Sequence, residues 1–199
     1  EYRRAIAAER HSSLRLAGAH WYLPDNSRIG SLSGSHGGQV TLSNGKQYRT
    51  LTVDGDLSGE VGFNLNTNLS ANQGDKIVVN GLATGNHTLH VRNSGNEPTK
   101  VQRLTLLTLN HGAQDKNAVT VNLRNQQNQS HVDAGAWRYT LASDERNQYY
   151  LHNPLKEAEL AKAKADEEKA AAAAAAKKLT DAQAARKRAE QLAAQAEAA

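Results

Sequence analysis

The stretch FNLNTNL, residues 63–69, places apolar or β-branched side chains at every second position, namely Phe63, Leu65, Thr67 and Leu69. Strict alternation of this kind predicts a β-strand with one buried face. The same period recurs on both sides of the stretch, at Leu14 and Leu16, Val40 and Leu42, Leu51 and Val53, Leu89 and Val91, Leu104 and Leu106, Val119, Val121 and Leu123, and Trp137, Tyr139 and Leu141. The pattern predicts about nine or ten short strands and no helix between residues 14 and 152.

Segments rich in Gly, Asn and Ser separate these strands and are typical of turns. They are SGSHGG (33–38), SNG (43–45), NQGD (72–75), NSGNEP (93–98) and NQQNQS (125–130). Many short strands joined by such turns fit a sandwich, an open barrel or a β-solenoid.

The supply of large side chains favours the solenoid. The chain has one Phe, two Trp, six Tyr and no Met, so Leu, Ile and Val must fill most of the core. In a solenoid, similar side chains of successive coils lie above one another at a spacing of about 4.8 Å, so only a narrow aliphatic core is needed. We therefore expect a β-solenoid, although no fixed-length repeat is visible.

The composition changes abruptly at Asn153-Pro154. Beyond it alanine makes up nearly half of the residues and glycine is absent, which predicts one long helix with Asn153 as N-cap and Pro154 at its first position. The large apolar residues are Leu155, Leu160, Leu179 and Leu192, whose spacing makes no heptad seam. We expect a solvated, monomeric spacer, with a partner-dependent helix as the alternative.

The basic cluster Arg186, Lys187 and Arg188 has two interpretations. It could be a targeting or anionic-surface signal, but three basic residues on a helix are usually a solvated face. The net charge of +4 is spread along the chain and gives no reason to expect a nucleic-acid partner.

No residue pattern predicts catalytic, cofactor-binding or metal-ligating chemistry. Cysteine is absent, and His87 and His90 stand three apart on a predicted strand, which places them on opposite faces. Asp75, with Lys76, fits a turn and a strand entry better than a catalytic role. Trp137 and Tyr139 could stack on a sugar, but we expect them to cover the open end of the solenoid core.

Residues 14–154 carry a longer series of motifs. They include WYLPDNSRIGSL (21–32), YRTLTVDGDLSG (48–59), FNLNTNL (63–69), GDKIVVNGLATGNHTLHVRNSGNEP (74–98), VDAGAWRYTL (132–141) and YYLHNP (149–154). This series resembles the C-terminal passenger region of type V autotransporters, the pertactin-like stem with its autochaperone segment. The resemblance implies a right-handed parallel β-helix in a virulence factor that reaches the bacterial surface or medium through the periplasm and outer membrane.

The alanine-rich helix resembles the α-peptide of the IgA-protease and adhesion-and-penetration autotransporters. Those passengers begin with a serine protease that carries a GDSG motif, and no GDSG occurs in these residues. We therefore expect a non-enzymatic piece of a longer protein. A serine protease elsewhere in that parent is what this second resemblance implies. The resemblance also implies a helical linker that leads to the protein's own translocator barrel as its partner.

These inferences divide the chain into a lead-in (1–13), a stem and autochaperone region (14–152) and a helical linker (153–199). The expected function is to support folding and secretion of the passenger. An adhesin-type module that binds host surface molecules is the alternative, and a lyase ranks last because no coil face gathers Asp, Lys or Arg. We expect folding to begin within residues 63–152, where Trp137, Tyr139, Tyr149 and Tyr150 would close the final coil.

Overall fold

The computed structural model describes residues 12–111, 118–144 and 147–198. The chain divides into two compact units, one running to Pro154 and one from Leu155 onward. The predicted lead-in falls almost entirely outside the described residues. Each unit is treated separately below.

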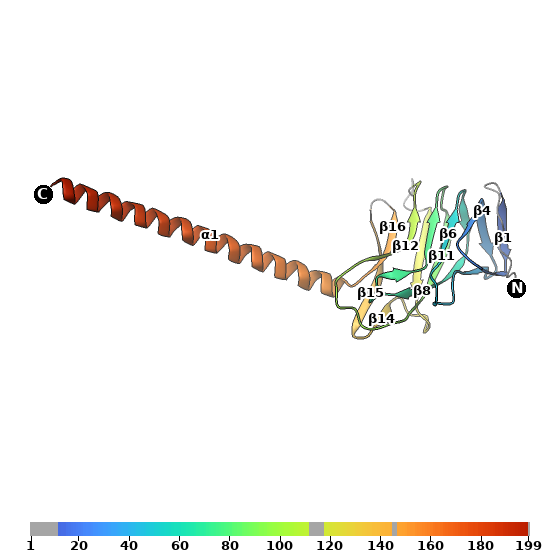
Figure 1. The fold of residues 1–199 in the computed structure, drawn as a ribbon. Helices are drawn as coiled ribbons and strands as arrows, with labels where there is room; N and C mark the ends of the chain where they lie inside the picture. The colour runs from blue at the N-terminus through green and yellow to red at the C-terminus, as the bar shows by residue number, and fades with distance from the viewer. Residues whose placement is uncertain (1–11, 112–117, 145–146, 199) are drawn as a thin grey trace. The chain divides into compact units, whose positions relative to one another are not determined.

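The first unit is a stack of coils whose strands form three sheets (Figure 1). Sheet 1 contains, in spatial order, β1 (Ser13–Ala17), β4 (Ser31–Ser35) and β7 (Leu57–Gly59). Sheet 2 contains β14 (Val132–Ala134), β15 (Trp137–Ser143), β16 (Gln148–His152), β12 (Leu104–Leu109), β10 (Lys76–Val79), β6 (Thr50–Val53) and β3 (Ser27–Ile29). Sheet 3 contains β13 (Val119–Arg124), β11 (Gly85–Asn93), β8 (Gly62–Asn68), β5 (Gln39–Thr41) and β2 (His20–Tyr22), with β9 (Gln73–Gly74) beside β8.

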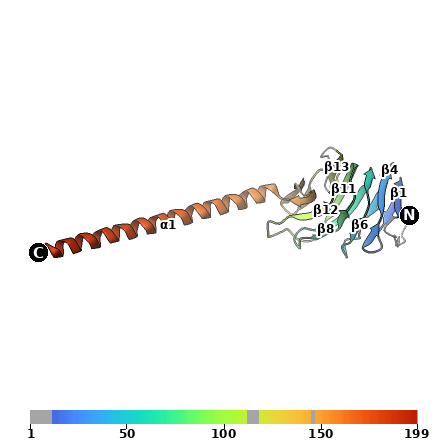
Figure 2. The same cartoon turned by 90° about the horizontal axis from the view of Figure 1, so that it is seen from above.

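The stack is a parallel β-helix, as predicted. The chain passes through the three sheets in turn up to β10 and then alternates between sheets 3 and 2. Each strand up to β13 except the short β9 lies parallel to the equivalent strand of a neighbouring coil. Figures 1 and 2 show this order directly, because the colour advances along the stack from β1 toward β12.

Inward side chains stack in rows that run through successive coils. The register aligns Trp21, Val40, Phe63, Leu89 and Leu123 in sheet 3 and Ile29, Val53, Val79 and Leu109 in sheet 2. All of these residues are buried. Burying each large side chain contributes about 1.5–3 kcal/mol, so the rows are the main source of stability.

The coils differ in length, which explains why the sequence shows no fixed repeat. Ser13 pairs with Ser31, Leu51 pairs with Ile77, and Leu89 pairs with Leu123, so the separation between partners nearly doubles along the chain. The strands keep a constant register because their inward faces must align, and the extra residues lie in the turns.

The C-terminal end of the stack departs from parallel pairing. β16 lies antiparallel to β12, β15 antiparallel to β16, and β14 antiparallel to β15. The run from Trp137 to Leu141 is the last alternating one that the sequence shows, but it is not the last strand, because β16 follows β15. The expected nine or ten strands are also too few: the described residues form sixteen, several of them only two or three residues long.

Tyr139 and Trp137 have unequal roles at this end. Tyr139 is fully buried in the core, whereas Trp137 is only partly buried and packs against it. The expectation that both rings cover the core therefore holds fully for Tyr139 and in part for Trp137. The deeply buried tryptophan is Trp21, in β2 near the other end of the stack.

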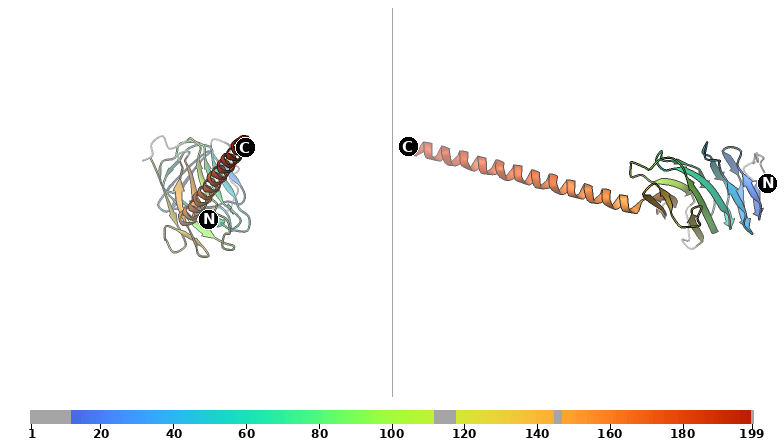
Figure 3. Two further views of the ribbon diagram at one scale, coloured as in Figure 1. Left: turned by 90° about the vertical axis from the view of Figure 1, so that its left-hand side faces the viewer. Right: turned by 90° about the horizontal axis from the view of Figure 1, so that it is seen from below.

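The second unit is α1 (Pro154–Glu197), a single helix with no buried residue (Figure 3). It begins at Pro154 directly after Asn153, as predicted. Its 44 residues extend over about 66 Å. Lys156 pairs with Glu159 and Arg186 with Glu190 along its exposed surface, and such pairs add only a few tenths of a kcal/mol each. Among the described residues, no helix is long and apolar enough to span a membrane.

Candidate functional site

The outer face of sheet 3 gathers polar side chains into regular rows. Because alternate residues face outward, the register that stacks the core also aligns Tyr22, Thr41, Asn64, His90 and Arg124. A second row contains His20, Gln39, Gly62, Thr88 and Asn122, and a third pairs Asn66 with Arg92. We call this surface the sheet 3 face.

Hydrogen bonds across strands fix the first rows in place. The Asn64 amide nitrogen donates to Thr41 Oγ1 at 2.9 Å and to Gln39 Oε1 at 3.2 Å. Thr41 Oγ1 also lies 2.6 Å from His20 Nε2. The His20 ring stacks on Tyr22 with 4.1 Å between ring centroids and 15° between planes, so an aromatic platform borders the polar rows.

Three hollows follow one another over the sheet 3 face. The central one has a volume of about 690 Å³ and is lined by Thr41, Ser43, Asn44, Asn64, Leu65, Asn66, His90, Val91, Arg92, Asn125 and Gln126. A smaller hollow of about 240 Å³ shares His90 with it, and one of about 140 Å³ shares Arg92 and Asn125. Because neighbouring hollows share wall residues, together they form a groove across the coils, which we call the sheet 3 groove.

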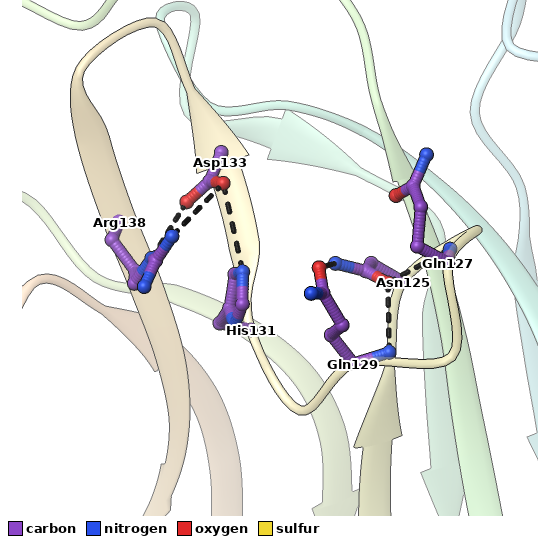
Figure 4. Close-up of polar contacts among 6 residues, drawn as sticks. All are labelled: Asn125, Gln127, Gln129, His131, Asp133 and Arg138. Carbon is purple, nitrogen blue, oxygen red and sulfur yellow. Dashed lines mark hydrogen bonds and ion pairs between the residues drawn. The ribbon is translucent and has the colours of Figure 1, made fainter.

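The loop after β13 forms one wall of this groove. Figure 4 shows the polar contacts within this loop. Asn125 Oδ1 accepts the backbone N–H groups of Gln127 and Gln129, both at 2.9 Å, and its amide nitrogen donates to Gln129 Oε1. Asn128 has a φ of 62°, a left-handed conformation that Asn tolerates better than most residues. A single asparagine side chain thus organises the whole turn.

Charges are distributed unevenly along the groove. Arg92 is exposed on β11 and makes no hydrogen bond or ion pair with any residue that the structure describes. Asp133, at the far end, bonds Arg138 and lies 3.6 Å from His131 (Figure 4), and the Arg138 hydrogen bond lowers the pKa of this carboxyl. Burial and the nearby Arg124 lower the pKa of His90. The central hollow thus combines one unpaired cation with neutral amides and hydroxyls.

Asp75 lies beneath the groove rather than in it. Its carboxylate is fully buried and accepts hydrogen bonds from Ser43 Oγ at 2.7 Å, the Arg49 N–H at 2.8 Å and the Asn66 N–H at 2.7 Å. Burial raises the pKa of Asp75, and the hydrogen bonds act in the opposite direction. The carboxylate of Asp75 thus links three separate segments of the chain through hydrogen bonds. Its burial places it out of reach of a substrate, which agrees with the structural role predicted from the sequence.

His87 and His90 face opposite sides of β11, as predicted. His87 is fully buried, while His90 faces the groove. His87 Nδ1 accepts the Val61 N–H at 3.2 Å, and Nε2 lies 2.7 Å from the Thr84 carbonyl oxygen, which can only accept a hydrogen bond. These partners assign the neutral tautomer that carries its proton on Nε2. Burial lowers the pKa of His87 accordingly.

Sequence patterns alone had not indicated the groove. Its residues are ordinary outward positions of strands, and they come together only because coils of unequal length align them. The signal available in the sequence was the series of Asn, Thr, His and Arg at the positions between the apolar ones. Among the described residues, no three His, Asp or Glu side chains are grouped so that they could hold a metal ion. Arg186 and its neighbours lie exposed on α1.

Comparison with known proteins gives a consistent result. The pertactin family model matches residues 30–153. The adhesion and penetration protein autotransporter of Haemophilus influenzae is 39% identical over 57% of this chain. The immunoglobulin A1 protease autotransporter of the same species is 37% identical over 75%, and the pertactin autotransporter of Bordetella bronchiseptica is 34% identical over 70%.

A solved structure gives the same result. The crystal structure of the Haemophilus influenzae Hap adhesin superposes with a TM-score of 0.65 and 31% identity over 74% of this chain. This chain covers 8%, 9% and 15% of the three relatives and 15% of the Hap chain, so it corresponds to a small part of each. These relatives are autotransporters, which are displayed on the bacterial surface or secreted through the outer membrane. The chain therefore belongs to the pertactin family and is part of an autotransporter passenger.

Proposed function

We propose that residues 14–152 are a stem and folding module, whose C-terminal coils fold first and template the coils before them. The observation that carries this proposal is the difference between the two ends of the stack. At the N-terminal end, β1, β2 and β3 are each the terminal strand of a sheet. Among the described residues, each pairs with one strand only. At the C-terminal end, antiparallel strands continue sheet 2 past the last parallel coil.

Contacts from a distant segment hold the C-terminal strands in place. Glu97 Oε2 accepts the Ala136 N–H at 2.8 Å, in the turn between β14 and β15. The Arg103 guanidinium lies 4.6 Å from the centroid of the Tyr150 ring in β16. The antiparallel strands cover one side of the last coil, so this coil can form without a neighbouring coil on that side. Its opposite edge then exposes backbone N–H and C=O groups with which the strands of the preceding coil can pair.

Refolding rates of two core variants test the proposal. Tyr139→Ala and Leu16→Ala each remove a buried side chain, at the C-terminal and N-terminal ends respectively, and each should cost about 2–5 kcal/mol. If the C-terminal coils nucleate folding, Tyr139→Ala slows refolding of the whole stack, and Leu16→Ala mainly accelerates unfolding. An unchanged refolding rate for Tyr139→Ala would contradict the proposal.

The proposal also gives this module a place within a longer parent protein. The relatives' names suggest a full-length protein with a passenger head that is an adhesin or a protease, whose functional domain lies outside these residues. In this proposal α1 is a solvated linker between the stem and the protein's own translocator barrel. Secretion of a full-length parent carrying Tyr139→Ala should fall, while Leu16→Ala should be secreted nearly normally.

An adhesin-type role is the second candidate, and the sheet 3 groove is the observation that favours it. A groove of several hundred Å³, lined by amides, hydroxyls and an unpaired arginine, is of the size that holds small ligands. Binding of the 199-residue chain to host cells, compared with a variant altered in the groove, tests this role. Equal binding by both would contradict it.

A further inference from the structure

We propose that the sheet 3 groove binds an extended polysaccharide that carries carboxylate groups. This inference names the ligand class for the adhesin-type role and rests on that role. It is independent of the folding function, because the groove lies on the outer face of the stack and leaves the core rows untouched.

The lining favours a hydroxyl-rich ligand over a peptide. The groove lies over the face of a sheet whose backbone groups are already paired between coils, so only side chains can recognise a ligand there. Those side chains are mainly Asn, Gln, Thr and Ser, and the only apolar residues in the central hollow are the strand residues Leu65 and Val91, which are themselves buried. Carboxamides and hydroxyls match sugar hydroxyl groups, since each can both donate and accept.

The amide rows are already in position before a ligand arrives. The hydrogen bonds of Asn64 to Gln39 and Thr41 fix its side chain, and Asn66 Nδ2 donates to the Ser43 carbonyl oxygen at 2.9 Å. Binding then costs little side-chain entropy. The stacked rings of His20 and Tyr22 lie on β2, beside the Gln39 and Thr41 of these rows, and offer an apolar edge for a sugar ring.

The charges point to an anionic sugar. None of the residues that line the central hollow is acidic, and Arg92 stands there without a hydrogen bond or ion pair to any part of the chain that the structure describes. An arginine in this setting can bind a carboxylate through two parallel N–H groups. The acidic residues of the groove, Glu60 and Asp133, line the two outer hollows, so an anionic ligand would meet Arg92 at the centre without a neighbouring carboxylate in the same hollow.

The rows also repeat. Thr41, Asn64 and His90 follow one another on successive coils at about 4.8 Å, and Asn66 and Arg92 do the same beside them. A linear polysaccharide is itself a repeat of hydroxyl-bearing rings, so one chain laid across the coils would meet a polar side chain at each step. A compact ligand would use only one hollow.

The experiment measures binding of the 199-residue chain to oligosaccharides by calorimetry at low and physiological salt. The probe is a hyaluronan decasaccharide, whose alternate rings carry carboxylates, and the neutral control is dextran of similar length. Heparin oligosaccharide, which carries sulfates in addition to carboxylates, tests whether charge density alone decides binding, and poly-glutamate distinguishes a glycan from an acidic peptide. We expect hyaluronan to bind, dextran to bind at least tenfold more weakly, and poly-glutamate not to compete.

Two arginine variants provide a matched comparison. Arg92→Glu reverses a charge inside the groove, and Arg15→Glu makes the same change on the exposed outer side of β1. We expect Arg92→Glu to weaken hyaluronan binding at least tenfold and Arg15→Glu to change it less than twofold, with melting temperatures unchanged. Gln126→Ala, a neutral change in the groove wall, should weaken binding severalfold without altering net charge.

Several results would overturn the proposal. They are the absence of hyaluronan binding at millimolar concentration, equal binding of dextran, stronger binding of heparin that Arg15→Glu and Arg92→Glu reduce equally, and displacement by poly-glutamate. None of them bears on folding, because the refolding rates of Tyr139→Ala and Leu16→Ala are measured without a ligand.

Discussion

The backbone N–H of Val61 donates to Nδ1 of His87, 3.2 Å away and one coil further along the chain. The bond requires an unprotonated Nδ1, and the Thr84 carbonyl oxygen at Nε2 already takes the one proton of the neutral ring. A second proton would sit on Nδ1 and would place two N–H donors, those of Nδ1 and Val61, opposite each other inside the core. The histidine therefore links the stability of two adjacent coils to pH.

We predict that the stack loses stability as pH falls through the range below 6.5. Burial lowers the folded-state pKa of His87 beneath its unfolded value, so the unfolded state binds the proton more readily. The stabilisation is present above pH 6.5 and disappears as pH falls through the folded-state pKa. Urea denaturation at pH 7.5 and pH 5 measures it.

His87→Gln isolates the histidine's contribution. The glutamine cannot titrate, so its free energy of unfolding should depend less on pH than that of the wild type. His36→Asn changes an exposed histidine with a φ of 52° and should leave the pH dependence unaltered. An identical pH slope in the wild type and in His87→Gln would rule this prediction out.

Asp75→Ala should destabilise the stack by about 3 kcal/mol or more. It leaves Ser43 Oγ and the N–H groups of Arg49 and Asn66 without their acceptor, and each unsatisfied buried donor costs about 1–3 kcal/mol. Asp25→Ala is the control, because Asp25 is exposed and should cost less than about 1 kcal/mol. Similar losses in the two variants would contradict the buried role of Asp75.

The pH dependence of Asp75 has the opposite sign to that of His87. Burial raises the folded-state pKa of this carboxyl above 3.8, so the folded state holds the proton more tightly than the unfolded state. Its contribution is favourable at low pH and is lost as pH rises through the folded-state pKa. Acid destabilisation should therefore persist in Asp75→Asn, as measured by the same denaturation series.

A row of glycines lets neighbouring coils approach at one corner. Gly59 has a φ of 73°, and a Cβ added to it would overlap the Gly34 carbonyl oxygen of the preceding coil. Gly37 has a φ of 79° but nothing within 4 Å of the Cβ position. We predict that Gly37→Ala costs only about 1 kcal/mol of backbone strain and that Gly59→Ala costs clearly more. Equal melting temperatures for the two variants would show that the close approach is unimportant.

The alternation of apolar residues was enough to predict the longer strands β8, β12, β13 and β15. Each has six or seven residues, which is long enough for the alternation to mark one buried face. It indicated the three-residue β5 only because Val40 is followed by Leu42 just beyond that strand, and it missed β2, β3 and β7, whose three residues hold too few positions for a period. The antiparallel return of β16 along β12 depends on long-range pairing, which no local pattern encodes. The sheet 3 groove was missed for the same reason, since Asn64 and His90 become neighbours only through the register.

The exposed helix gives a prediction of its own. None of the four leucines of α1 is buried, and they form no seam, so residues 155–199 as an isolated peptide should remain monomeric at micromolar concentration. Sedimentation equilibrium measures this. A stable dimer would mean that the leucines find a partner despite their spacing.

Pulse-labelling hydrogen exchange during refolding tests the central claim, C-terminal nucleation, most directly. Amide protons of β12, β15 and β16 should become protected first, followed by β10 and β8, with β1 and β4 last. Native-state exchange should give the same order of protection. Earlier or equal protection of β1 and β4 would contradict the account.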